Sequence, residues 1–315
     1  MFATKLESAP ENAVFASYLI RVRPNRKVDP IFLSHFFNSS WYWDQITSKS
    51  VGAAQPGVNA TKLESLEVPL PALSEQRRIA AILDQADALR AKRRTALAQL
   101  DEMAQALFVE MFSDPGSNPR GWPSAPLSAL ARAEDTINYG VIQPGDDYEN
   151  GIPIVRVGDL TEGRVSHQKL KKIDPAIDAA YKRSRLRGDE ILISCVGSIG
   201  IVALTSATER GFNIARAIAR VRVHSGIHRE YVAAFLRSSH VQNYFENELR
   251  TVSQPTLNIK QICETRILVP PFELQEKFLA QLSALEMVAS RLKKSQDELE
   301  LLFSSLQHRA FRGEL

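Results

Sequence analysis

The chain has 315 residues, of which 44% are hydrophobic and 24% are charged, and its 39 basic and 36 acidic side chains leave a net charge of +3. This composition suits about two folded domains and excludes a disordered, collagen-like or disulfide-stabilised chain. Because the net charge is small, any surface that binds nucleic acid must be a local feature of the molecule.

Cysteine usage and the first residues predict the compartment. Only Cys195 and Cys263 are present, so the reduced thiols of a cytosolic protein are expected. Residues 1–8 lack the apolar core of a signal peptide, and no apolar run approaches the roughly 20 residues of a membrane span. We therefore expect a soluble, cytoplasmic protein with no membrane partner.

The first 71 residues predict one strand and one helix. The strand is expected over Val14–Arg23 and the helix over Ile31–Ile46. Both segments have equivalents 199 residues later in the chain, where the strand alternation and the helical apolar stripe are clearer.

A long helix is expected over residues 72–112. The segment contains no Gly or Pro and is rich in Ala, Leu, Arg, Gln and Glu, which favour helices. Asp114-Pro115-Gly116 then supplies a stop signal.

Residues 113–271 read as mixed α/β. Strands are expected at residues 152–157, 190–195, 200–204 and 213–223. A helix is expected over His228–Leu249, where apolar side chains follow the helical period.

A second long helix is expected over residues 272–315. Inward-facing positions at alternating three- and four-residue spacing predict a coiled-coil seam in each long helix. The seam positions are Ala86, Leu89, Arg93, Ala96, Leu100, Met103 and Leu107, and Leu285, Val288, Leu292, Ser295, Leu299, Leu302 and Leu306. Helices about 55–60 Å long, at 1.5 Å per residue, are expected to pack on each other antiparallel. A pair that only holds two domains apart is the alternative.

An internal repeat at a constant offset of 199 residues links the two halves. Arg21-Val22-Arg23 recurs as Arg220-Val221-Arg222, and Gln76 recurs as Gln275. The chain therefore reads as the second half of one module, followed by a whole module.

Two loop regions carry candidate ligand contacts. Eight basic residues and only two acids lie within Arg164–Arg187, which suits a phosphate backbone or a merely solvated face. The turn Cys195–Gly200 contains two glycines that would let backbone amides approach a ligand, and a simple hairpin explains it equally well.

Catalytic and metal-binding motifs are not found in the sequence. The six histidines occur in no His-Glu-x-x-His helix or Cys/His metal spacing, and no Gly-x-Ser-x-Gly elbow or phosphate-binding loop is present. The sequence assigns no catalytic residue and no metal ligand.

The chain resembles the specificity subunit of type I restriction–modification systems. The resemblance rests on four stretches: Pro69–Arg78, echoed by Val269–Gln275; Asn150–Leu160; Gly188–Gly200; and Ser253–Ile259. It implies an α+β fold in which mixed α/β target recognition domains are joined by two long antiparallel coiled-coil helices. Residues 1–71 would be the C-terminal half of a first recognition domain, and residues 113–271 a complete second one.

The resemblance also implies a non-catalytic reader of double-stranded DNA. Each recognition domain would read half of a bipartite site, and the helices would dock methyltransferase subunits. S-adenosylmethionine, ATP and Mg²⁺ would be bound by the methyltransferase and the translocase/restriction subunit, so this chain would bind no cofactor. A second copy or a complementary half-subunit is a further partner to consider. A structural protein whose helical bar only bridges partners, and a stand-alone nuclease, remain alternatives.

The candidate DNA contacts are polar and basic residues whose side chains suit bases or phosphates. They are Tyr139, Gln143, Arg156, Lys169, Lys171, Lys172, Arg183, Ser198, Gln254, Thr256 and Asn258. Gln254 and Asn258 recur in both modules, so closing the loop into the following helix is the alternative role for them.

Overall fold

The computed structural model describes residues 14, 16, 19–49, 60–249 and 256–315. It divides into two compact units, residues 1–100 with 287–315 and residues 101–286. The division cuts both long helices, α4 (Leu73–Phe112) and α10 (Phe272–Arg312), so each unit contains part of both.

The described part of the first unit is helical. It contains α1 (Pro30–Phe37), α2 (Ser40–Lys49) and α3 (Ala60–Glu64) beside the start of α4 and the end of α10. Asp29 begins α1, because its carboxylate accepts hydrogen bonds from two backbone N–H groups of the first turn, each 3.0 Å long. The core joins α1 to the long helices through Phe32, Phe36, Leu83 and Phe311.

Over residues 101–249 and 256–286 the second unit contains three sheets and five shorter α-helices. Six strands form the largest sheet, in the order β2 (Asn138–Tyr139), β10 (Ile218–Val221), β7 (Ile191–Ser194), β8 (Val202–Leu204), β5 (Arg164–Val165) and β4 (Leu160–Thr161). The others are β6 (Lys171–Ile173), β3 (Ile152–Val155) and β9 (Asn213–Ile214), and the pair β1 (Ser124–Pro126) and β11 (Arg266–Leu268). The helices are α5 (Leu127–Leu130), α6 (Pro175–Ala180), α7 (Arg229–Leu236), α8 (Ser239–Leu249) and α9 (Ile259–Glu264).

The six-stranded sheet is buried on both faces. In β7, Ile191 and Ile193 belong to the cluster that includes α7, α8 and the adjoining ends of the long helices. Leu192 belongs to a second cluster, which it shares with Val155 and Ile214 of the three-stranded sheet. Successive strand side chains point to opposite faces, so an uninterrupted apolar strand suits this central position.

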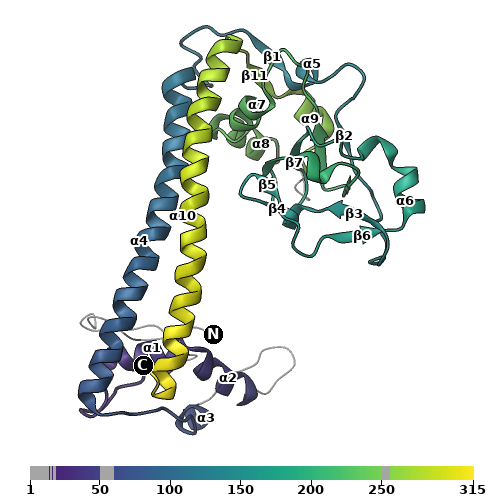
Figure 1. Cartoon of the computed structure of the whole chain (residues 1–315). Coiled ribbons are helices and arrows are strands. Elements are labelled where there is room, and N and C mark those ends of the chain that lie inside the picture. Colours follow the sequence, from purple (N-terminus) through teal and green to yellow (C-terminus); the bar gives the residue numbers. More distant parts are fainter. Residues whose placement is uncertain (1–13, 15, 17–18, 50–59, 250–255) are drawn as a thin grey trace. The chain divides into compact units, whose positions relative to one another are not determined.

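The long helices lie side by side and run antiparallel within each unit (Figure 1). In the first unit the Nε atom of Arg90 in α4 donates to a carboxylate oxygen of Glu300 in α10, 2.8 Å away. In the second unit the rings of Phe108 and Phe278 are 5.7 Å apart between centroids. Residues near the start of α4 thus contact residues near the end of α10, and residues near the end of α4 contact residues near the start of α10. This confirms the predicted α+β fold with two packed helices.

The predicted seam is wrong at four positions. Leu89, Met103, Val288 and Leu302 are about half exposed, at 53%, 53%, 45% and 51%. The inward positions are the next residues, Arg90, Ala104, Ala289 and Phe303. An apolar pattern with alternating three- and four-residue spacing fits either of two adjacent residues at such a position, so the sequence alone does not decide between them. Here the inward residue Arg90 extends over the Phe303 ring, 4.1 Å from its centroid. The other ten predicted seam residues are partly buried.

Four further predictions about elements need correction. The helix expected over His228–Leu249 is two helices, which break at Arg237 and Ser238, and Ile31–Ile46 breaks at the equivalent residues. The strand expected over residues 213–223 is divided into β9 and β10. The described residues of Val14–Arg23 form no strand, because strand pairing needs a neighbour and the described part of the first unit contains none.

The internal repeat has a structural counterpart at the two glutamines. Gln76 is 1% exposed; its Oε1 accepts from the Asp29 backbone N–H at 2.9 Å, and its Nε2 donates to the Pro71 carbonyl at 2.8 Å. Gln275 is fully buried and makes the same two bonds 199 residues later, at 3.0 Å and 2.9 Å. Each glutamine thus connects one long helix to the loop before its short helix.

Candidate nucleic-acid interface

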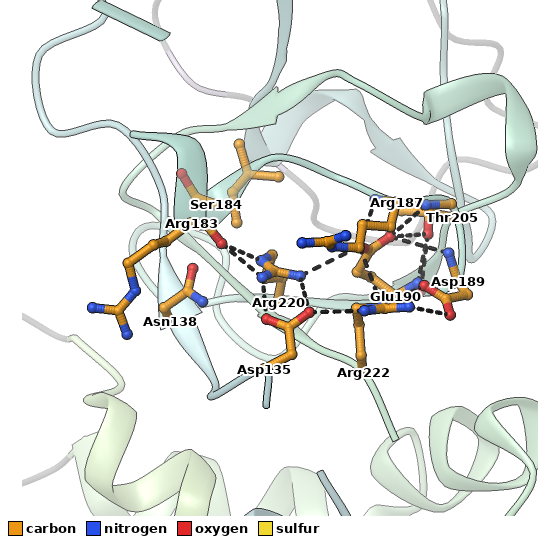
Figure 2. A network of polar contacts seen from close by, with 12 residues as sticks. Asp135, Asn138, Arg183, Ser184, Arg187, Asp189, Glu190, Thr205, Arg220 and Arg222 are labelled. Atoms are coloured by element: carbon orange, nitrogen blue, oxygen red, sulfur yellow. Dashed lines mark hydrogen bonds and ion pairs between the residues drawn. The ribbon is translucent and has the colours of Figure 1, made fainter. Parts of the chain in front are cut away.

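A buried ion-pair network connects strands of the six-stranded sheet in the second unit. The guanidinium of Arg220, on β10, pairs with Asp135 and lies 3.3 Å from Glu190, which is completely buried (Figure 2). Arg220 also donates to the Arg183 carbonyl at 3.0 Å and 2.6 Å. Because a buried charge is tolerated only when it is paired, this network holds the short 3-10 helix Lys182–Ser184 against the sheet.

Arg222 extends the network towards solvent. Its Nε donates to Asp189 at 2.6 Å and a terminal nitrogen donates to Asp135 at 3.0 Å. Hydrogen bonds from Arg222 hold the pKa of Asp189 below its usual value. Burial disfavours the charge of Asp135, yet hydrogen bonds from Arg220 and Arg222 outweigh it and lower its pKa as well. The charged forms therefore persist at neutral pH.

Glu190 shapes the turn that precedes β7. Its carboxylate accepts the backbone N–H groups of Arg187, Gly188 and Asp189, at 2.6, 2.9 and 3.1 Å. The Thr205 hydroxyl donates a further bond of 2.9 Å. The turn is thus held from inside, while the Arg187 side chain is exposed.

A hollow of about 680 Å³ lies beside this turn. Five cations and one carboxylate line it: Lys182, Arg185, Arg187, Arg210, Arg222 and Asp189. Arg185 is paired with Asp178, and Arg222 with Asp189. Among the described residues no carboxylate lies within ion-pair distance of Lys182, Arg187 or Arg210. These exposed cations are available to an anion such as a phosphate.

Four of the predicted contacts lie around β3 and β6. Arg156 donates to the Asp159 carboxylate at 3.2 Å and to the Lys169 carbonyl at 3.3 Å. Lys171 donates to the Gly145 carbonyl, and Lys172 to the Glu149 carbonyl at 2.9 Å. Three of these side chains therefore also hold neighbouring loops, and the described contacts of Lys169 leave its exposed ammonium available.

The remaining candidate DNA contacts differ in whether their polar groups already have partners within the unit. The Tyr139 hydroxyl donates to the Leu257 carbonyl at 2.6 Å, and burial raises its pKa to about 12. Thr256 forms a β-bridge with Val196, and the Asn258 backbone N–H donates to Gln261 at 2.7 Å, where α9 begins. Tyr139, Thr256 and Asn258 thus help to hold residues 256–258 against the sheet and at the start of α9.

Exposed polar side chains form the other group. Gln143 and Ser198 are exposed, and Arg183 donates to the Thr136 hydroxyl at 3.2 Å from an exposed position. Ser198 lies in the hairpin between β7 and β8, so the hairpin expected as one alternative for residues 195–200 is present. Gln254 lies outside the described residues.

Sequence reasoning missed part of the hollow. The basic run 164–187 is no single loop, because it contains β5, β6 and α6, which separate its cations. Arg210 is distant in sequence and reaches the hollow through its bond to the Arg187 carbonyl, 3.2 Å long. Of the cations that line the hollow, the basic run could have identified only Lys182, Arg185 and Arg187.

Among the described residues, no three His, Cys, Asp or Glu side chains come together as metal ligands would. No helix in the described part of the chain has both the length and the apolar character of a membrane span.

A family model described as the type I restriction modification DNA specificity domain matches residues 6–100 and 132–301. The chain belongs to this family. The EcoBI specificity subunit of Escherichia coli is 28% identical over 302 residues, 87% of this chain and 64% of that protein. The StySPI specificity subunit of Salmonella potsdam is 25% identical over 97% of this chain and 70% of that one. The chain thus spans about two thirds of the length of these specificity subunits.

Solved structures of the family share the fold. A chain solved in a study of complex assembly and conformational transition of the type I system aligns with a TM-score of 0.59 and 24% identity, covering 93% of this chain and 74% of that one. The S subunit from M. genitalium aligns with a TM-score of 0.54 and 17% identity, covering 90% and 73%. At these identities the likeness concerns the fold alone.

Proposed function

We propose that this chain is the DNA-specificity subunit of a type I restriction–modification complex. Its second unit reads one half of a bipartite site on duplex DNA, and its paired helices dock methyltransferase subunits. Methylation, ATP-driven translocation and cleavage belong to the methyltransferase and restriction subunits, which hold S-adenosylmethionine, ATP and Mg²⁺. The site of action is the cytoplasm.

The observation that carries the proposal is the cationic hollow in a member of a DNA-specificity family. Lys182, Arg187 and Arg210 offer exposed positive charge around the hollow, and Glu190 holds the turn that carries Arg187 in place. A cation fixed on a rigid turn loses little side-chain and backbone freedom when it meets a phosphate. Phosphate contacts of this kind set the register of a protein on DNA.

Base readout is assigned to exposed side chains outside the hollow. Gln143 suits adenine, Arg183 and Lys169 suit guanine or phosphate, and Ser198 suits either base edge. Tyr139, Thr256 and Asn258 serve chiefly to support the surface, because the Tyr139 hydroxyl and the backbone groups of Thr256 and Asn258 are engaged within the unit.

We further propose the domain boundaries that the sequence predicts. Residues 1–71 would form the second half of a recognition domain, and residues 113–271 a complete one. Residues 72–112 and 272–315 would be the spacer helices that separate two half-sites.

Salt-dependent DNA binding tests the proposal. The full chain, assembled with its methyltransferase subunits, is titrated with a randomised duplex library at several salt concentrations. Wild type is expected to select a motif. Arg187→Gln and Arg210→Gln should weaken binding to all duplexes alike and reduce the slope of log K against log salt by about 0.9 for each phosphate that is no longer neutralised.

The matched control is Lys294→Gln, which removes an exposed cation from α10 in the first unit. It should leave affinity and slope unchanged. Assembled complex that selects no motif contradicts the function. Selection with unchanged slopes in both hollow variants contradicts the assignment of the hollow.

A further inference from the structure

We propose that Arg216 and Ile142, beside the paired ends of β2 and β10 in the second unit, read two neighbouring base pairs in the major groove of DNA. Arg216 binds the O6 and N7 acceptors of a guanine, and Ile142 packs on the methyl group of a thymine in the next base pair. The inference rests on the proposed function and specifies which bases the second unit selects.

Arg216 lies in a turn between β9 and β10 whose backbone is held by three hydrogen bonds. Its own N–H donates to the Val141 carbonyl at 2.8 Å, and the Ile218 N–H closes the turn by donating to the Ala215 carbonyl at 2.9 Å. The carbonyl that follows Arg216 accepts the N–H of Cys195 at 2.7 Å. Because the backbone is fixed, Arg216 loses only side-chain freedom when it binds a ligand.

Val141 connects this turn to the segment that follows β2. It forms a parallel β-bridge with Ala215, and its N–H donates to the Ile214 carbonyl at 2.8 Å. The two segments approach so closely that a Cβ atom on Gly140 would lie 1.7 Å from the Ile214 oxygen. Glycine is therefore required at residue 140, and the two segments form one unit of fixed geometry.

Arg216 and Ile142 each follow one member of the bridge and point outward. Val141 is fully buried, whereas Ile142, the next residue, is 58% exposed. Arg216 is exposed as well. Paired segments of extended backbone lie about 4.8 Å apart, and successive base pairs about 3.4 Å. The spacing of the two side chains thus suits adjacent base pairs.

The guanidinium of Arg216 differs from those of Arg220 and Arg222, which follow it along the chain. Both of the later arginines pair with the carboxylate of Asp135. Within the part of the chain that the structure describes, the Arg216 side chain has no carboxylate within ion-pair distance and makes no hydrogen bond. All its donors are therefore available, and two of them match the paired acceptors of guanine.

Ile142 supplies a contact of the opposite kind. Its side chain cannot form a hydrogen bond, so the group that it suits in the major groove is the methyl group of thymine. The O6 and N7 atoms of guanine face the same groove. One approach of the turn to the duplex therefore satisfies both side chains.

Base analogues in the selected duplex test the proposal. The wild-type full chain, assembled with its methyltransferase subunits, first selects a motif from the randomised library. Duplexes of that motif are then made with 7-deazaguanine, which lacks the N7 acceptor, or with deoxyuridine, which lacks the thymine methyl group, at one position at a time.

We expect one guanine at which 7-deazaguanine weakens wild-type binding by about tenfold and leaves binding by Arg216→Gln unchanged. At the next base pair, deoxyuridine should weaken wild-type binding by about fourfold and leave binding by Ile142→Ala unchanged. The urea midpoint of Arg216→Gln should equal that of wild type, because the side chain makes no contact that the substitution removes.

Arg187→Gln is the reference for a phosphate contact. It should weaken binding to all duplexes alike and keep the wild-type response to 7-deazaguanine. If Arg216→Gln behaves in the same way, Arg216 binds a phosphate and the proposal is wrong. A response to deoxyuridine that Ile142→Ala retains overturns the part given to Ile142. Wild-type complex that selects no motif contradicts the proposed function and this inference with it, whereas a motif that both variants select unchanged overturns this inference alone.

Discussion

The two units treat the same repeated sequence differently. Towards the long helices they agree: Gln76 and Gln275 make equivalent bonds, and Phe36 and Phe235 are buried at equivalent places. Away from the helices the two units differ, because β10 is a central strand whereas the equivalent segment, Leu19–Val22, is exposed. A repeat keeps the interactions whose two partners both lie within it, whereas an interaction that needs a further segment forms only in the unit that contains this segment.

The largest expected loss of stability comes from truncating the buried phenylalanine that occupies equivalent positions in the two units. Phe235→Ala and Phe36→Ala should each destabilise their own unit by about 3–5 kcal/mol, because each leaves a cavity in a closed core. Urea titration followed by hydrogen exchange in each unit measures the two values. A cost below about 1 kcal/mol for Phe36→Ala alone would mean that the first unit lacks the close packing of the second.

The glutamines test whether the equivalence extends to polar groups. Gln275→Leu should cost about 1–3 kcal/mol, because it leaves the His228 N–H and the Pro270 carbonyl without a partner in a buried place. Gln76→Leu should cost the same. Gln281→Leu, an exposed position on α10, is the control and should change urea midpoints little.

The ion-pair network distinguishes the units by their pH dependence. The folded-state pKa of Asp189 is below its unfolded value of about 3.9, so its contribution is complete above that value and is lost as the pH falls through the folded-state pKa. Asp189→Asn should therefore reduce the stability of the second unit at pH 7 and flatten its decline below about pH 4.

Urea midpoints from pH 3 to 7 measure this effect in each unit. It should be smaller than that of the glutamines, because Asp189 is 36% exposed and solvent screens the pair. The first unit should respond no differently from wild type. An unchanged slope in the second unit would contradict the role given to Asp189.

The smallest effect is expected at the exposed seam positions. Leu302→Ala should change stability by no more than about 0.5 kcal/mol, because the side chain is half in water. Phe303→Ala, one residue later and 9% exposed, should cost about 3–5 kcal/mol. Similar losses of stability for the two variants would restore the seam that the sequence alone predicted.

Much of the fold was predictable because its signals are local. Residues 72–112 contain no helix breaker, and the helix ends just before Asp114-Pro115-Gly116. Ile191–Ser194 was recognisable as a buried strand from its apolar run. The long helix expected after His228 was wrong in one place, since Arg237 and Ser238 break it with a turn that apolar spacing does not reveal.

The candidate site was less predictable because its parts meet only in three dimensions. Arg210 joins Arg187 from 23 residues away. Tyr139 was predicted as a DNA contact because its polar side chain suits bases or phosphates, but its hydroxyl donates to the Leu257 carbonyl. Sequence shows which side chains carry suitable groups, whereas their engagement depends on neighbours that folding supplies.

By itself the sequence determined the two long helices, the 199-residue repeat and the membership of the DNA-specificity family, because each depends on residue order along the chain. Only the tertiary structure decided which helix face turns inward, which cations remain unpaired in the hollow, and that Val221 is buried while Val22 is exposed. The physical reason is that burial and pairing belong to contacts between distant segments, so identical residues acquire different roles when only one of them has a neighbour.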